Sequence, residues 1–84
     1  MTDTAKLLSP PVNFAVVQLP ERKYPGVIIQ GDTLAGLVAQ LGRMKSLLDK
    51  GDTGEVIAEI EEMEEQLSGA LSFYKKICAE HSIS

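Results

Sequence analysis

The sequence predicts an α+β fold in which a β-hairpin is followed by a long antiparallel helical hairpin, in the order ββαα. Residues 13–30 hold two runs rich in β-branched and aromatic residues. Residues 32–50 carry apolar residues at spacings of three and four, and residues 53–81 keep that spacing over more than three heptads. With a length of 84 residues, we expect one domain, 1–84.

Residues 1–12 are expected to form a flexible arm. Ser9 is followed by Pro10 and Pro11. Consecutive prolines remove two amide donors and favour extended backbone in the residues before them. Little structure is therefore expected before Val12.

The β-hairpin is expected over 13–30, with strands NFAVVQL (13–19) and GVIIQ (26–30). The connection PERKYPG reads as an exposed loop that ends in the turn residues Pro25 and Gly26. Apolar side chains alternate to both faces of each strand, so neither face is polar. A hairpin covered by helices on one side needs only one apolar face, and a second copy of the chain is the economical cover for the other.

The first helix is expected over 32–50. Gln30 and Gly31 form the strand-to-helix turn, and Asp32 suits the N-cap. An apolar stripe and a neighbouring stripe of small residues give this helix two packing faces. The apolar stripe comprises Leu34, Leu37, Val38, Leu41, Met44 and Leu48, and the small stripe comprises Ala35, Ala39, Gly42 and Ser46.

The second helix is expected over 53–81. Gly51 suits the left-handed residue that ends the first helix, and Asp52 with Glu55 resembles a capping box. The short link makes the helices antiparallel. Because the second helix is the longer one, its last turns should pack on the strands, on a partner copy, or on both. The residues concerned are Phe73, Tyr74, Ile77 and Cys78.

The size of the chain favours a homodimer. A domain this short buries only about 60–65% of the surface that its unfolded chain exposes, and disulfides, metals or oligomerisation usually supplement such a core. One cysteine cannot form an intrachain disulfide. We therefore expect a homodimer whose helices form a four-helix arrangement.

Charge and hydropathy exclude two classes of partner. The net charge is −4, and the eight basic residues are scattered, which argues against nucleic acid binding. Apolar stretches stay well short of the roughly 20 residues that a membrane span requires, and the N-terminus lacks the apolar region of a signal peptide. We expect a cytoplasmic protein that binds neither nucleic acid nor membrane.

Residues 55–65 contain six glutamates and no basic residue. Most lie opposite the apolar stripe, with Glu59 and Glu64 flanking it, which is typical of a solvated helix face. Such a face can also dock a basic protein partner. Small all-helical nucleotide pyrophosphatases hold magnesium with Glu-x-x-Glu pairs of the same spacing, but the neighbouring helix offers only Asp49 as a second acidic group. The partner-binding candidates are Glu61, Glu62, Glu64 and Glu65.

Two further clusters carry chemistry. Cys78 and His81 lie one helical turn apart and are weak metal-ligand candidates, although a buried thiol and a C-terminal histidine explain both without a metal. The loop residues Arg22, Lys23 and Tyr24 form a candidate contact patch. No metal or other cofactor is expected.

The stretch NFAVVQLPERKYPGVIIQGDTL, residues 13–34, resembles the N-terminal signature of an uncharacterised family of small bacterial proteins, a domain of unknown function. In that signature an Asn-Phe-Ala-Val-Val strand and a Tyr/Phe-Pro-Gly-Val strand lead to Gln-Gly-Asp-Ser/Thr-Leu. The resemblance implies a small two-layer bacterial protein of the cytoplasm. It also singles out the turn and cap residues Pro25, Gly26, Gln30, Gly31 and Asp32.

Two function classes follow from these patterns. The sequence contains no recognisable catalytic set, so we expect a non-enzymatic protein-interaction or regulatory module that acts as a homodimer. The small acidic immunity and antitoxin proteins, which neutralise a basic partner, are the closest type. The alternative is a small-molecule or metal-dependent enzyme with its site at the dimer interface.

Overall fold

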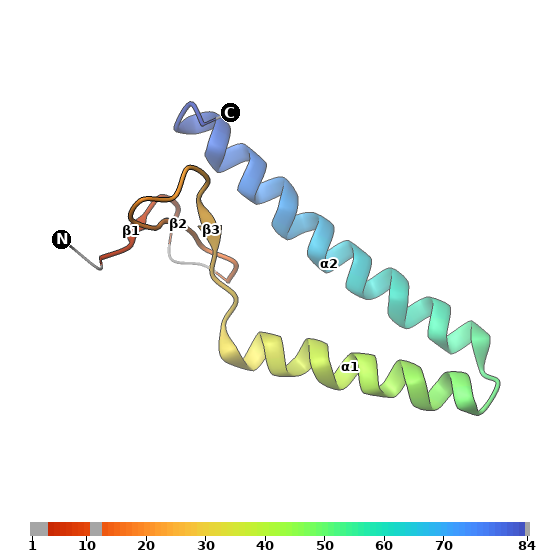
Figure 1. Ribbon diagram of the computed structural model, residues 1–84. Coiled ribbons are helices and arrows are strands. Elements are labelled where there is room, and N and C mark those ends of the chain that lie inside the picture. Colours follow the sequence, from red (N-terminus) through yellow and green to blue (C-terminus); the bar gives the residue numbers. More distant parts are fainter. Residues whose placement is uncertain (1–3, 11–12, 84) are drawn as a thin grey trace. The chain divides into compact units, whose positions relative to one another are not determined.

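The computed structural model describes residues 4–10 and 13–83 and contains three strands followed by two helices (Figure 1). They are β1 (Lys6–Leu7), β2 (Val16–Gln18), β3 (Gly26–Val27), α1 (Gly31–Asp49) and α2 (Thr53–Glu80). This arrangement confirms the predicted α+β class and the ββαα order of the hairpin and helices. Residues 1–3 and 11–12 of the expected arm lie outside the described residues, as does residue 84.

The chain divides into two compact units. The strand unit comprises Met1–Gln30 and Ala70–Ser84, and the helix unit comprises Gly31–Gly69. The helix α2 therefore begins in the helix unit and ends in the strand unit. Each unit is described separately below.

The strand unit contains a three-stranded antiparallel sheet in the order β1-β2-β3. In its register Leu7 lies opposite Val17, and Val16 lies opposite Val27. The expectation of little structure before residue 12 is wrong for Lys6–Leu7. Both residues are exposed, so β1 has no buried pattern of its own to recognise and exists because it pairs with β2.

Ser9 extends the pairing of the N-terminal segment with β2. Its hydroxyl accepts a hydrogen bond from the backbone N–H of Val16 at 2.8 Å, and the N–H of Leu8 donates to the carbonyl of Val16 at 2.9 Å. The Ser9 side chain is buried, and its hydroxyl also donates to the carbonyl of Pro10. A hydroxyl here takes the place of a backbone acceptor for a buried amide.

The two predicted strands pair as an antiparallel hairpin but are shorter than 13–19 and 26–30. Phe14 has φ +62°, in the left-handed region, which interrupts the extended backbone before β2. One hydrogen bond continues beyond the strand bounds, from the N–H of Ile28 to the carbonyl of Ala15 at 2.7 Å. Val27, Ile28 and Ile29 remain exposed, so the segment at the end of the hairpin carries apolar residues at the surface.

The core of the strand unit consists of residues from β2, the residue that precedes it and the last turns of α2. Val16 is completely buried. The other buried apolar residues are Ala15, Val17, Ile77 and Cys78. Burial of Ile77 and Cys78 agrees with the expectation that the end of the second helix packs in the half of the chain that holds the strands.

Both helices end in the same backbone motif. Gly51 has φ +77°, its N–H donates to the carbonyl of Leu48, and the N–H of Asp52 donates to the carbonyl of Leu47, as a Schellman motif requires. The predicted left-handed Gly51 is thus confirmed. At the end of α2, Ser82 has φ +56°, and its N–H and that of Ile83 donate to the carbonyls of Ala79 and Cys78.

Asp52 caps α2 as predicted, whereas the predicted N-cap Asp32 lies inside the first turn of α1, because this helix begins at Gly31. A carboxylate oxygen of Asp32 accepts from the N–H of Thr33 at 2.9 Å, and one of Asp52 accepts from the N–H of Glu55 at 3.3 Å. Negative charge at these positions also complements the helix dipole. The observed bounds of α1 and α2 lie within one residue of the expected 32–50 and 53–81.

The helix unit buries no apolar side chain. Across Gly31–Gly69, all of which is described, Gln40 is the buried residue. The two helices diverge from the turn at Gly51 (Figure 1). Leu37 and Met44 of the predicted apolar stripe are half-buried, whereas Leu34, Val38, Leu41 and Leu48 are exposed.

Among the described residues, neither α1 nor α2 has an apolar stretch of the length that crossing a lipid bilayer requires.

Candidate functional site

One candidate site is an apolar face on the helix unit, formed by side chains of both helices. It contains two adjacent hollows of about 270 and 440 Å³ that share Leu41, Met44 and Ile60. We call the whole set of lining residues the apolar face. It consists of Leu41, Met44, Lys45, Leu48, Val56, Ile60, Met63, Glu64 and Leu67.

Side chains of the apolar face are half exposed. The relative exposures of Leu41, Leu48, Ile60 and Leu67 lie between 44% and 59%. Isolated exposed leucines are ordinary, but a contiguous apolar surface on two neighbouring helices is typical of a site where another protein packs. This face has the composition of half a helix-bundle core.

The contact between the two helices is partly polar. The side-chain amide of Gln40 donates to the carbonyl of Glu59 at 3.0 Å, and Arg43 Nε lies 3.6 Å from Glu59 Oε1. The other carboxylate oxygen of Glu59 is buried without a hydrogen-bond partner among the described residues. Polar groups thus occupy part of the seam between the helices, while aliphatic side chains line the open face.

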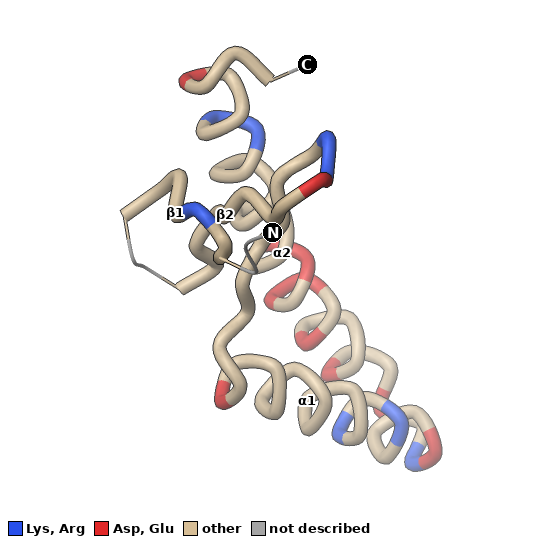
Figure 2. Tube along the Cα trace, turned by 60° about the vertical axis from the view of Figure 1, so that its left-hand side comes forward, with Lys and Arg blue, Asp and Glu red and all other residues tan. Residues whose placement is uncertain are grey.

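The predicted acidic candidates do not form one set. Glu61, Glu62, Glu64 and Glu65 are all exposed along α2, where acidic residues predominate (Figure 2). Glu64, however, lines the apolar face, whereas the other three do not line either hollow. The sequence could reveal this difference, since Glu64 lies four residues after Ile60 and three before Leu67.

Charge is distributed unevenly between the two units. The helix unit holds nine of the twelve acidic residues and three of the eight basic residues, which gives it a net charge of −6. The strand unit carries the remaining three acidic and five basic residues and has a net charge of +2. Any electrostatic attraction of a basic partner therefore arises from the helix unit.

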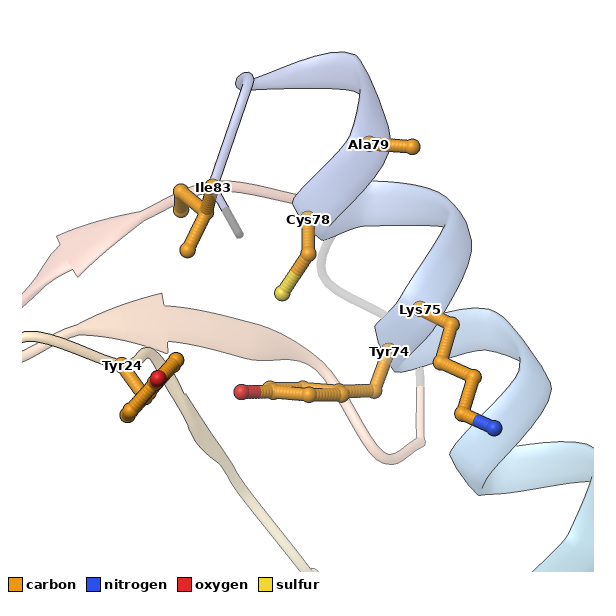
Figure 3. Close-up of a pocket in the computed structure, with 6 residues that line it drawn as sticks. All are labelled: Tyr24, Tyr74, Lys75, Cys78, Ala79 and Ile83. Atoms are coloured by element: carbon orange, nitrogen blue, oxygen red, sulfur yellow. The ribbon is translucent and has the colours of Figure 1, made fainter.

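The strand unit has a second candidate site, a pocket of about 280 Å³ (Figure 3). Tyr24 from the hairpin loop and Tyr74 and Cys78 from α2 point into it, and Lys75, Ala79 and Ile83 complete its lining. A hydrogen bond with the Cys78 thiol, and then partial burial, raise the pKa of the Tyr74 hydroxyl. The pocket can hold a small apolar group that also hydrogen-bonds to a phenol.

Sequence reasoning did not find this pocket. Tyr74 and Cys78 are one helical turn apart, and the sequence predicts packing contacts for both and a weak metal-ligand role for Cys78, but no pocket. Tyr24 was assigned to a contact patch on the loop, fifty residues away. The pocket depends on the loop meeting the end of α2, which no local pattern encodes.

The predicted contact patch lies at the exposed hairpin loop. Arg22, Lys23 and Tyr24 are exposed, and the ammonium of Lys23 lies 5.2 Å from the centre of the Tyr24 ring, a cation–π distance. The side-chain amide of Gln18 donates to the carbonyls of Leu19 and Arg22, which holds the turn. Of the three patch residues, Tyr24 is the one that also lines the pocket.

Cys78 and His81 lie in different surroundings. Cys78 is buried, whereas His81 is exposed and its Nε2 lies 3.1 Å from the carbonyl oxygen of Leu8. With a proton on Nε2, the ring donates to that oxygen. Over residues 4–10 and 13–83, no three His, Cys, Asp or Glu side chains are placed to hold one metal ion.

The turn and cap residues flank the strand unit's last strand and the start of α1. Pro25 is buried, and Gly26 is half-buried within β3. Gln30, Gly31 and Asp32 are exposed at the start of the helix. The Asp32 carboxylate accepts a hydrogen bond from the N–H of Thr33, which is a local contact of the first helical turn.

Comparison with known proteins yields a family without an assigned function. The family model described as "Family of unknown function (DUF6959)" matches residues 1–84. Neither the curated proteins nor the solved structures contain a match to this chain.

Proposed function

The chain belongs to the family of unknown function DUF6959, and we propose from its own surfaces that it is a non-enzymatic protein-interaction module that forms a homodimer. The observation that carries this proposal is the half-exposed apolar face of the helix unit. A unit of 39 residues without a buried apolar side chain gains little stability from its own packing. A second copy supplies the missing half of the core.

The acidic residues outside the apolar face give the dimer a second surface. Glu61, Glu62 and Glu65 are exposed and remain accessible when the apolar face is covered. The dimer presents this strip twice, which increases attraction for a basic protein partner. This arrangement suits a regulatory protein that binds and neutralises a basic target.

The homodimer is tested by light scattering and sedimentation over a range of concentrations. The expected species has twice the mass of the 9.1 kDa chain. Leu41→Asp and Ile60→Asp each place a charge on the apolar face, so both should produce folded monomers. Circular dichroism checks that the helices are retained.

Ala39→Asp is the matched control. It introduces the same charge on an exposed position of α1 outside the apolar face and should leave the dimer intact. A monomeric natural chain contradicts the proposal. Dissociation by Ala39→Asp but not by Leu41→Asp also contradicts it, because the small-residue stripe would then form the interface.

The acidic surface has a separate test. Proteins captured on the immobilised chain are compared at low and high salt, and again with Glu61, Glu62 and Glu65 changed to Gln. We expect a basic partner that is retained only at low salt and only by the natural chain. A partner that binds regardless of salt, or that still binds the substituted chain, refutes the electrostatic part of the proposal.

A further inference from the structure

Two helical stripes with the same spacing cross the apolar face, and their members that line its hollows are Leu41, Lys45, Leu48, Ile60, Glu64 and Leu67. On α1, positions 34, 38, 41, 45 and 48 are separated by four, three, four and three residues, and positions 53, 57, 60, 64 and 67 of α2 repeat those intervals. One shift of 19 residues converts the first stripe into the second. Alternating intervals of three and four keep each stripe along one side of its helix, as in the seam of a coiled coil.

Each stripe contains one charged residue, at the same place in the pattern. On α1 it is Lys45, which lines one hollow, and on α2 it is Glu64, which lines the other. The remaining positions of the two stripes are leucine, valine or isoleucine, apart from Thr53. The charges have opposite signs, so the surface is complementary to itself.

The two charges lie on opposite sides of the centre of the face. Leu41 and Ile60 line both hollows, Lys45 follows Leu41 by four residues, and Glu64 follows Ile60 by four residues. Four residues of α-helix advance by about 6 Å. Since the helices leave the turn in opposite chain directions, the two charges are displaced in opposite directions from the centre.

We propose that two copies pair about a two-fold axis perpendicular to the helices, near Leu41 and Ile60, so that Lys45 forms an ion pair with the partner's Glu64. This pairing rests on the homodimer proposed above. The axis places α1 beside the partner's α1, antiparallel to it, and makes α1 run parallel to the partner's α2, which lies diagonally across the four-helix arrangement with the 19-residue shift as the register. Leu41 is then level with the partner's Ile60, and Leu48 is level with the partner's Leu67. Symmetry forms every contact twice.

The other two-fold arrangement, with the axis along the helices, separates the charges. Lys45 and Ile57 are each six residues from Gly51, and Glu64 and Val38 are each thirteen residues from it. Each charge would therefore lie level with an apolar side chain of the partner. An unpaired charge in an apolar interface is unfavourable, so the ion pair selects the perpendicular axis and sets the register.

The test exchanges the two charges. Lys45→Glu and Glu64→Lys each oppose like charges at two places in the dimer and should weaken dimerisation by at least about tenfold. The double variant K45E/E64K restores opposite charges and should dimerise within about threefold of the natural chain. Sedimentation equilibrium gives the dissociation constants.

Mixing the two single variants provides the sharpest readout. One copy with Lys45→Glu and one with Glu64→Lys form a heterodimer in which both ion pairs are complete, so native mass spectrometry should show mainly the heterodimer. Lys50→Glu and Glu62→Lys are matched controls, because they change the same charges outside the apolar face and should leave self-association within about threefold of the natural chain.

The results separate the two proposals. A natural chain that is monomeric at all concentrations refutes the homodimer and the register together. A natural chain that is dimeric, but for which Lys45→Glu and Glu64→Lys act no differently from their controls or the mixture forms no preferential heterodimer, refutes the ion pair and leaves the homodimer standing.

Discussion

The strand unit and the helix unit are both small, but they differ in how far they bury their apolar side chains. The strand unit has short, irregular strands, yet it buries Ala15, Val16, Val17, Ile77 and Cys78 and satisfies buried polar groups with Ser9. The helix unit has long, regular helices but leaves its aliphatic side chains half exposed. Regular secondary structure therefore does not indicate where side chains are buried. In this chain the less regular unit contains the buried core, although its Val27, Ile28 and Ile29 stay exposed, and the more regular unit has a surface suited to a partner.

The largest effect is expected from a substitution in the buried core of the strand unit. Ile77→Ala removes a side chain that is 3% exposed and should lower the free energy of unfolding by about 2–5 kcal/mol. Ile57→Ala makes the same chemical change at a side chain that is 55% exposed, and should cost less than about 1 kcal/mol in a sample diluted until it is monomeric.

Urea unfolding of both variants measures this difference. A similar cost for the two substitutions in the monomer would show that the helix unit closes a core of its own, and the contrast between the units would then be lost. A cost of Ile57→Ala that increases with protein concentration would instead extend the contrast, because the partner would be what buries Ile57.

A smaller effect is expected from the buried hydroxyl. Ser9→Ala leaves the N–H of the fully buried Val16 without its acceptor and should destabilise the protein by about 1–3 kcal/mol. Ser68→Ala is the control, since Ser68 is exposed within α2 and the change should stay within about 0.5 kcal/mol. Equal effects in thermal unfolding would contradict a structural role for Ser9.

Ser9 belongs to the part of the fold that could not be predicted from the sequence. The fold class, both helices and the left-handed Gly51 follow from local signals: spacing, capping residues and a glycine at a helix end. The strand at Lys6–Leu7, the hydrogen bond of Ser9 and the pocket at Tyr24 and Tyr74 depend on segments far apart in the chain. Periodicity likewise identifies the apolar stripe of α1 but cannot indicate whether the same chain covers it.

The smallest expected effects compare the helix end of each unit. Gly51→Ala meets no atom within 4 Å of the added Cβ, so its cost is that of a left-handed backbone, about 1–2 kcal/mol. In the strand unit Ser82 has the same left-handed backbone and is destabilised by it. Ser82→Gly should therefore stabilise the protein. The gain should stay below about 1 kcal/mol, because glycine also increases the freedom of the unfolded chain. Denaturant unfolding should show opposite signs for the two substitutions. A loss of stability with Ser82→Gly would mean that contacts of the Ser82 side chain stabilise the fold by more than its left-handed backbone destabilises it. The two helix ends would then differ energetically in spite of their shared motif.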